Sequence, residues 1–175
     1  MIQFVEIVDS AHLYWPFLTG CYIEAFPPDE RRSTDELLSL IKRDIFRGDV
    51  LMQAGEPVGL MLSWRLGWFR YIEHFAMDAA VRGHGLGDIA LNIYLQQSAL
   101  PVVLEVEPPV DEIKCRRIRF YERIGFQLCS EIFIQPPYSS EKSSVELRLM
   151  EWGGKLLQND FVQVKNELYR TVYGR

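Results

Sequence analysis

Residues Arg82–Gly87 form a glycine-rich stretch between a strand-like segment and a helix-like segment. Before it, residues 71–77 are mainly apolar and aromatic with polar residues interleaved, which is typical of a strand. After it, apolar residues recur from Leu86 to Tyr94 at helical spacing. Glycines at such a junction let a ligand approach the backbone, and the first N–H groups of the helix can bind an anion, normally a phosphate. The sequence therefore predicts a phosphate-binding loop, to which Arg82 adds positive charge.

The motif lacks the features of two common nucleotide sites. A dinucleotide site requires Gly-x-Gly-x-x-Gly, with an acidic residue about 20 positions later. Here Asp88 stands where the third glycine should be. A nucleotide P-loop requires Gly-Lys followed by Ser or Thr, and the sequence has no such triplet. The pattern Arg-x-x-Gly-x-Gly is instead similar to the acyl-CoA pyrophosphate loop of the GNAT acetyltransferases.

A second segment strengthens this resemblance. Residues 101–106 are typical of a buried strand, and residues 114–126 predict a helix that ends at a glycine. Tyr121 lies four residues before Gly125, as a tyrosine does before a terminal Gly-Phe in the GNAT family. The chain is therefore identified as a member of that family by resemblance over roughly residues 50–132. The resemblance implies an α/β (α+β) fold, with a central mixed sheet of about seven strands flanked by helices.

The resemblance also implies acetyl-CoA as co-substrate. Its pantetheine arm would pair with the backbone of the strand, and its pyrophosphate would lie on the loop amides. An acid at Asp88 suits the start of a helix, although its side chain must point away from a phosphate. The alternatives are a plain tight turn and a solvated charge at Arg82. The implied cofactor-binding residues are Phe75, Ala76, Met77, Arg82, Gly83, His84, Gly85, Leu86, Gly87 and Asp88.

Tyr121 is the candidate general acid. Its hydroxyl stays protonated at neutral pH and can donate to the leaving thiolate. The alternative is a packed core aromatic, which helical spacing alone favours. The helix departs from the family pattern at Lys114 and Arg117, and extra residues around 108–111 precede it. These two basic residues could reach a CoA phosphate or form a solvated face.

The candidate bases are carboxylates on two strands. Glu105 matches the glutamate of a Leu-Glu-Val strand that serves as base in family members acting on protein N-termini. Glu107 lies two residues further on, so we expect it on the same side of the sheet. Glu73 lies in the preceding strand, which we expect to run parallel to the first as its neighbour. Clustered carboxylates would favour a cationic amine.

Composition narrows the class of protein. The chain has 175 residues, a length that predicts one domain over 1–175. Its net charge of −5 argues against a nucleic-acid partner, and no apolar run reaches membrane-span length. Three scattered cysteines indicate a reducing, cytoplasmic location without disulfides or a metal site. The sequence does not decide whether the protein forms a homodimer.

Further elements are expected from periodicity and turn residues. A strand over 1–8 precedes a helix over 12–26 with Pro16 in its first turn, and a helix begins at Ser33 and runs to a stop at Gly48. Strands over 50–54 and 57–64 meet at a turn of Gly55 and Glu56. Strands near 126–132 and 145–151 finish the sheet. An amphipathic helix over about 156–172 is expected as a C-terminal appendage that braces the sheet or walls the acceptor pocket.

The predicted function is an acetyl-CoA-dependent N-acetyltransferase. We expect the acetyl group to pass to the primary amine of a small molecule or peptide, by direct attack in a ternary complex. The alternative is a non-catalytic acyl-CoA sensor or adaptor with the same fold. Turnover on a panel of amines separates the two.

Overall fold

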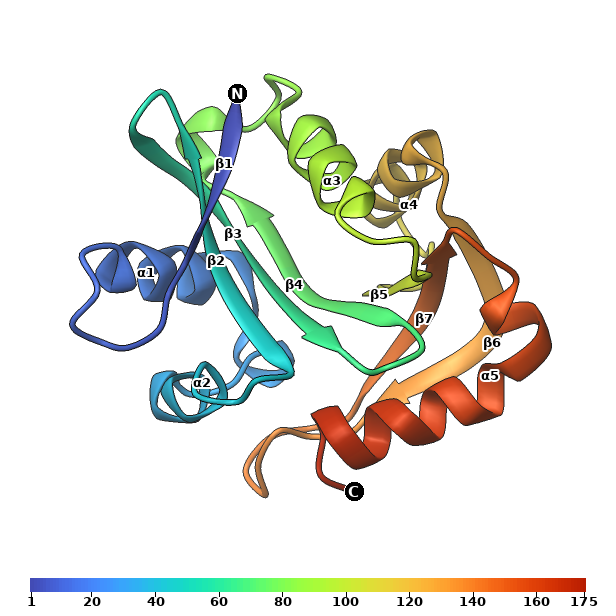
Figure 1. Ribbon diagram of the computed structural model, residues 1–175. Coiled ribbons are helices and arrows are strands. Elements are labelled where there is room, and N and C mark those ends of the chain that lie inside the picture. Colours follow the sequence, from blue (N-terminus) through green and yellow to red (C-terminus); the bar gives the residue numbers. More distant parts are fainter. The chain divides into compact units, whose positions relative to one another are not determined.

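The computed structural model describes all 175 residues and contains seven β-strands and five α-helices (Figure 1). The strands form a mixed sheet flanked by helices, which confirms the predicted fold class. The strands are β1 (Ile2–Glu6), β2 (Phe46–Gln53), β3 (Glu56–Arg65), β4 (Arg70–Met77), β5 (Val102–Val106), β6 (Gln127–Gln135) and β7 (Val145–Trp152). The α-helices are α1 (Trp15–Ala25), α2 (Thr34–Leu40), α3 (Leu86–Gln96), α4 (Glu112–Ile124) and α5 (Leu156–Glu167). The remaining helical elements are the short helices η1 (Pro28–Glu30) and η2 (Ala79–Val81) and a π-helix η3 (Leu168–Val172).

The chain divides into two compact units, each built from two separate segments. The first unit contains Met1–Arg65 and Ile72–Ser98. The second contains Leu66–Tyr71 and Ala99–Arg175. The assignment of one domain over 1–175 stays a prediction.

In the first unit the strands lie in the order β1-β2-β3-β4. β2 pairs antiparallel with both β1 and β3. The β2–β3 hairpin turns at Ala54 and Gly55, whose φ angles are 52° and 88°. A type I′ turn, which matches the twist of the flanking strands, requires positive φ at both of these positions. The predicted turn at Gly55 and Glu56 was therefore wrong by one residue, because the strand pattern does not show that Ala54 has left the ladder.

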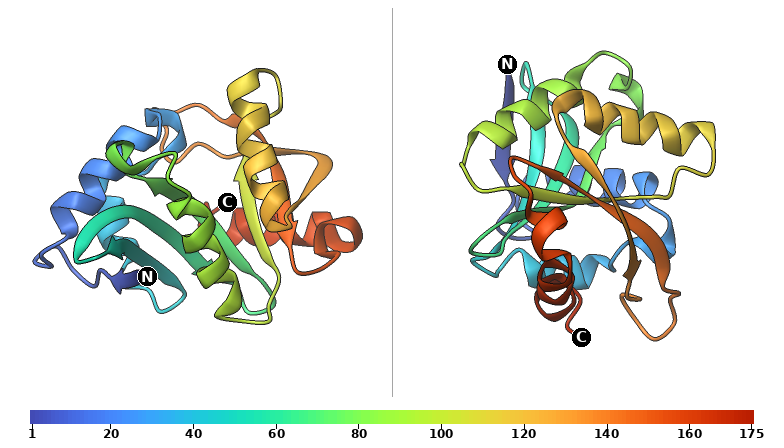
Figure 2. Two further views of the ribbon diagram at one scale, coloured as in Figure 1. Left: turned by 90° about the horizontal axis from the view of Figure 1, so that it is seen from above. Right: turned by 90° about the vertical axis from the view of Figure 1, so that its right-hand side faces the viewer.

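Helices α1 and α3 pack on opposite faces of this part of the sheet (Figure 2). The side chain of Leu18 in α1 approaches Gly48 in β2. Leu51 lies three residues further along β2 and so faces the other side, where it joins a core cluster with Leu86 and Ala90 of α3. Pro16 lies in the first turn of α1, as predicted.

Helix α2 is shorter than the sequence predicts. Ser33 and Glu36 form the expected capping box at its start, but the helix ends at Leu40. The predicted stop, Gly48, lies inside β2 opposite Leu62. A Cβ there would already be 3.4 Å from a carbon of Ile41. Gly48 is thus a close-packing residue in a strand, and strand pairing overrides the helical spacing of the apolar residues before it.

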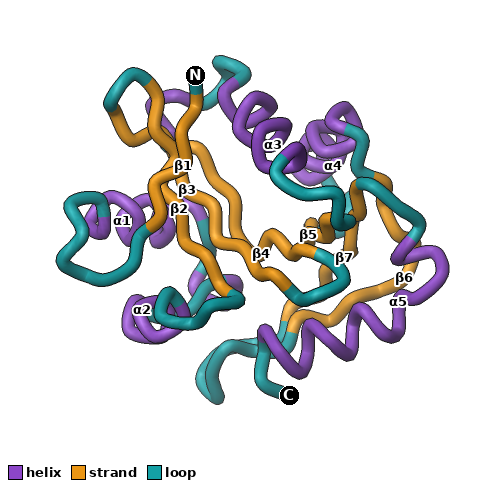
Figure 3. The backbone as a smooth tube through the Cα atoms, viewed as in Figure 1, coloured by secondary structure: helices purple, strands orange, loops and turns teal.

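In the second unit the strands lie in the order β5-β7-β6, and β7 pairs antiparallel with both neighbours. Helix α4 packs on β5 and β6, and α5 packs on β6 and β7. Figures 1 and 2 show α4 and α5 on opposite sides of these strands. Figure 3 shows the loop of residues 136–144 that joins β6 to β7.

The C-terminal helix is present as predicted. Helix α5 continues into η3, and together they span residues 156–172. The buried side chains of this segment include Leu157, Val164, Leu168 and Val172, which recur at helical spacing. None of the helices combines the length and apolar character needed to cross a membrane.

Candidate active site

The glycine-rich loop starts directly after β4 and is held by bonds to its own backbone. Asp78 Oδ1 accepts a hydrogen bond of 2.9 Å from a backbone N–H of η2. Arg82 Nε donates to the carbonyl of Met77 at 2.9 Å, and His84 Nδ1 lies 3.1 Å from the carbonyl of Val81. Arg82 and His84 are both exposed. These bonds fix the conformation of the loop, and Arg82 and His84 lie on its surface.

The start of α3 is open to an anion. Gly85 is the N-cap and has a left-handed φ of 74°, and Gly83 has a φ of 84°. Glycine adopts these angles without a Cβ clash. No side chain caps the first N–H groups, which belong to Leu86, Gly87 and Asp88. A Cβ on Gly83 or Gly85 would meet no atom within 4 Å, so the backbone faces open space. This arrangement suits a phosphate group.

The end of β4 and the start of α3 share one core. Leu86 is 7% exposed and lies in a buried cluster with Ile2, Leu51, Val58 and Ala90. Phe75 and Met77 pack against that cluster. Ala76, between them, is half-buried. The residues predicted to bind the pantetheine arm and the pyrophosphate are thus fixed on the same hydrophobic support.

A close backbone approach fixes β4 further. A Cβ on Gly59 of β3 would lie 2.5 Å from the carbonyl oxygen of Ala76, a distance that no side chain tolerates. The N–H of Asp78 donates to the carbonyl of Val58 at 2.9 Å. Glycine at position 59 therefore allows β3 to hold β4 where the loop begins.

Tyr121 lies in α4, between well-formed helix ends. Asp111 caps the start by accepting from the N–H of Lys114 at 2.9 Å, and Gly125 ends the helix with a φ of 107°. Tyr121 is 8% exposed, and its hydroxyl makes no hydrogen bond in the structure. Burial raises the pKa of Tyr121 to about 12, against a smaller lowering by the charge of Arg117. The phenol is therefore protonated at neutral pH and has its proton available to donate.

The basic residues of α4 are paired with acids. Arg117 and Lys114 both contact Glu107, and the Lys114 Nζ atom lies 3.8 Å from its carboxylate. Lys114 also lies 3.4 Å from Asp111. Glu107 is thus engaged by α4, just beyond the end of β5. Its negative charge is therefore matched by basic residues of α4.

Glu105 lies in β5 and is half-buried. Its Oε1 atom accepts a hydrogen bond of 2.7 Å from the hydroxyl of Tyr173, which follows η3. The partner in this bond is a neutral hydroxyl, so the bond leaves the negative charge of the carboxylate in place.

Glu73 has a different environment. Its side chain is 1% exposed and its Oε1 atom lies 2.9 Å from Nη2 of Arg32. Its Oε2 atom accepts a hydrogen bond of 2.7 Å from Nε1 of Trp64. The neighbouring His74 is buried against Tyr22, and burial lowers its pKa. Both oxygens of Glu73 are thus bonded, and its charge is matched by an arginine.

The predicted site residues are divided between the two units. Glu73, the end of β4 and the loop lie in the first unit, whereas Glu105 and Tyr121 lie in the second. The sequence analysis missed three side chains that form bonds to Glu73 or Glu105. These side chains are Arg32, Trp64 and Tyr173. Arg32 and Trp64 lie 41 and 9 residues from Glu73, so no local pattern links them. Tyr173 lies one residue beyond the predicted C-terminal helix.

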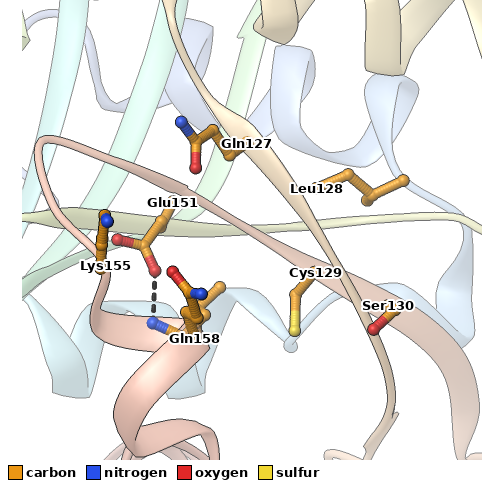
Figure 4. A pocket seen from close by; sticks show the side chains of 8 residues that line it. Gln127, Leu128, Cys129, Ser130, Glu151, Lys155 and Gln158 are labelled. Carbon is orange, nitrogen blue, oxygen red and sulfur yellow. Dashed lines mark hydrogen bonds between the residues drawn. The ribbon is translucent and has the colours of Figure 1, made fainter.

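A pocket of about 250 Å³ lies in the second unit, beside β6, β7 and the start of α5 (Figure 4). Glu151 in it is 4% exposed and accepts bonds from the N–H groups of Leu156, at 2.8 Å, and Leu157. This carboxylate therefore caps α5. The lining contains no residue predicted for catalysis or cofactor binding, which separates this pocket from the predicted chemistry. It is formed by Gln127, Leu128, Cys129, Ser130, Glu151, Lys155, Leu157 and Gln158.

Comparisons with known proteins give a consistent result. Residues 8–126 match the family model described as the acetyltransferase (GNAT) family. The structure of a putative GNAT-family acetyltransferase from Bacteroides thetaiotaomicron is similar with a TM-score of 0.93 and 33% identity, over 99% of both chains. No curated protein matches the sequence.

Two more distant structures share the fold. The ribosomal-protein-S18-alanine N-acetyltransferase of Escherichia coli has a TM-score of 0.63 and 16% identity, over 86% of this chain and 92% of that chain. A GNAT-family acetyltransferase of Elizabethkingia anophelis, solved with acetyl-CoA bound, has a TM-score of 0.60 and 11% identity, over 86% of this chain and 96% of that one.

Proposed function

The chain belongs to the GNAT family of acetyltransferases, and from this premise we propose that it transfers an acetyl group from acetyl-CoA to a primary amine. The amine belongs to a small molecule or a peptide and attacks directly in a ternary complex. The observation that carries the proposal is the uncapped start of α3, with open space around Gly83 and Gly85 directly after β4.

The residues of the first unit fit acetyl-CoA. The N–H groups of Leu86–Asp88 hold the pyrophosphate, and Arg82 adds a positive charge beside them. The backbone of Phe75–Met77 pairs with the amides of the pantetheine arm. The bound co-substrate supplies an acetyl group activated as a thioester.

Acyl transfer to an amine needs two proton movements. The attacking ammonium must lose a proton, and the leaving thiolate must gain one. Tyr121 supplies the second proton, because burial keeps its hydroxyl protonated and no other group holds it. A carboxylate accepts the first proton, directly or through water.

Glu105 fits the role of base better than Glu73. A base needs a lone pair that can take a proton at neutral pH, and an ion pair with arginine stabilises the ionised form against protonation. Glu73 is bonded to Arg32 and Trp64 and is nearly inaccessible. Glu105 is only half-buried and so more accessible than Glu73, and one of its bonds comes from a neutral tyrosine.

A screen of amines with acetyl-CoA, read by mass spectrometry, tests the proposal. The panel contains simple alkylamines, polyamines and peptides with free N-termini, and the Tyr121→Phe variant serves as the control for catalysis. We expect at least one acetylated amine, with CoA released in equal amount and much less product from the variant. Stabilisation of the protein by CoA without any acetylated product would contradict catalysis and favour the sensor alternative.

A further inference from the structure

The C-terminal segment brings a tyrosine to the proposed base. The hydroxyl of Tyr173 donates to Oε1 of Glu105 at 2.7 Å, and Tyr173 is 9% exposed. Tyr173 lies outside residues 8–126, which the family model matches. The contact therefore joins a strand inside the family domain to a segment beyond it.

Several bonds hold this segment in place. The N–H of Tyr173 donates to the carbonyl of Leu168, five residues earlier, which closes a π-helical turn. Such turns are rare in proteins, and those that occur are often found at functional sites. The hydroxyl of Tyr169 donates to the carbonyl of Ile134 in β6 at 2.6 Å. Arg175 donates to the carbonyl of Pro137 at 2.8 Å. The position of Tyr173 is thus fixed on both sides.

The direction of the hydrogen bonds is also fixed. A tyrosine hydroxyl has one proton, and Tyr173 gives it to Glu105. The hydroxyl of Tyr71, which is fully buried, lies 3.2 Å from that of Tyr173. Tyr71 must therefore donate to the oxygen of Tyr173. The chain from Tyr71 through Tyr173 to Glu105 orients one oxygen of the carboxylate.

We propose that Tyr173 is a positioning residue for acyl transfer, whose hydroxyl holds the Glu105 carboxylate oriented and ionised for accepting the proton of the amine. The inference rests on the proposed function, with Glu105 as base. A hydrogen bond donated to a carboxylate favours its charged form, and a neutral donor does so without removing the charge. The C-terminal appendage thus completes the catalytic group.

Three tyrosines of the second unit interact with Glu105, directly or through one another. Tyr173 and Tyr71 are buried phenols. Burial raises the pKa of Tyr169, and the charge of Glu105 raises it further. The residue opposite Glu105 on β7 is the apolar Leu149. Below pH 8 a change at Tyr173 therefore acts on the titration of Glu105 and not on that of another nearby tyrosine.

The test compares two single-hydroxyl deletions in the same segment. Tyr173→Phe removes the bond to Glu105, whereas Tyr169→Phe removes a bond to a backbone carbonyl. We expect the acidic limb of the pH–rate profile of Tyr173→Phe to move up by about one pH unit. Turnover below that limb should fall about tenfold, with a change of less than about twofold above it. The acidic limb of Tyr169→Phe should stay near that of the unaltered protein, because Tyr173 keeps its hydroxyl and is still held by the π-helical turn and by Arg175. Equal profiles in the two variants would overturn the proposal.

A second measurement separates this inference from the proposed function. The carboxyl carbon of Glu105, labelled with carbon-13 and assigned by its loss in Glu105→Gln, is titrated by NMR in the intact chain. Its midpoint should lie higher in Tyr173→Phe than in Tyr169→Phe. If no amine is acetylated, the proposed function fails, and the carboxyl titration alone decides whether Tyr173 controls Glu105. An unchanged midpoint would refute that control. Where turnover is measurable, Tyr173→Phe should add no loss in a Glu105→Gln background.

Discussion

Arg32 and Glu73 form an ion pair that is almost completely buried. The Nη2 and Oε1 atoms are 2.9 Å apart, and the side chains are 10% and 1% exposed. Arg32 lies between η1 and α2, and Glu73 lies in β4. The N–H of Arg32 also donates to the hydroxyl of Tyr22 in α1 at 2.8 Å. The pair therefore ties the connection between α1 and α2 to the strand that leads into the glycine-rich loop.

Replacing Arg32 should destabilise the protein strongly. Arg32→Ala removes the arginine that matches the buried charge of Glu73, and breaking a buried ion pair costs about 3–5 kcal/mol. The free energy of unfolding, measured with urea, checks this value. The pair of Arg119 and Glu112, exposed by 53% and 75%, provides the control. Arg119→Ala should cost less than about 1 kcal/mol. Similar costs for the two variants would show that burial does not set the value of the Arg32 pair.

Local sequence signals predicted much of the fold. The glycine at 125 ends α4, and glycines at 83 and 85 lead into α3, as predicted, whereas α4 starts at Glu112, two residues before the predicted start, because Asp111 caps it. These features depend on residues close together in sequence. The end of α2 was wrong because Ile41 and Ile45 follow a helical spacing, while the chain from Phe46 is taken into pairing with β3. That pairing is a long-range interaction that periodicity does not contain.

The environment of the acids could not be predicted in the same way. The sequence placed Glu105 first and Glu73 second as candidate bases, on the context of their strands and not on their surroundings. Their difference arises from Arg32, in a loop before α2, and Tyr173, at the end of the chain. Partners so distant in sequence are set by tertiary packing, so the sequence left the choice of base open.

A side chain at Gly85 should block binding of CoA. Gly85→Ala places a methyl group in the open space at the start of α3, where the pyrophosphate is proposed to bind. The matched control is Gly55→Ala in the β2–β3 turn. Gly55 also has positive φ, and a Cβ there would meet no atom within 4 Å. Both variants should lose about 1 kcal/mol of stability from backbone strain. Only Gly85→Ala should abolish the rise in melting temperature caused by CoA. Equal stabilisation of both variants by CoA would place the cofactor elsewhere.

Tyr121→Phe should reduce turnover without weakening CoA binding. The change keeps the ring contact with Phe126 and removes a hydroxyl that makes no hydrogen bond in the free protein. Loss of a general acid lowers kcat by about 10²- to 10⁴-fold. Steady-state kinetics measures kcat, and calorimetric titration with CoA measures affinity. A kcat within about twofold of normal would assign Tyr121 to packing alone.

The same residue should make the protein sensitive to alkali. The pKa of Tyr121 is raised by burial from 10.0 to about 12, so the unfolded chain loses this proton at a lower pH than the folded chain does. Unfolding is then favoured as the pH rises from about 10 to 12, by about 2–3 kcal/mol from this group. Burial also raises the pKa of Tyr22 and of Cys21, and these groups add to the slope. Urea unfolding at pH 8 and above should give a flatter pH dependence for Tyr121→Phe. An unchanged slope in that variant would show that Tyr121 is not buried as described.

Glu105→Gln should reduce activity most where the amine needs a base. The substitution keeps the size of the side chain and its ability to accept the bond from Tyr173, but removes the charge. Near neutral pH the amine is mainly protonated, so turnover should fall about 10²-fold or more. Raising the pH deprotonates the amine in solution and should recover much of that loss.

The companion variant Glu73→Gln decides between the two carboxylates. Because Glu73 is bonded to Arg32 and Trp64, its substitution should alter stability more than the shape of the pH–rate profile. Profiles of kcat/KM from pH 6 to 10 for both variants make the comparison. A loss at Glu105→Gln that is equal at every pH would show that Glu105 only orients the substrate. A loss that is recovered at high pH in Glu73→Gln alone would transfer the role of base to Glu73, despite its ion pair.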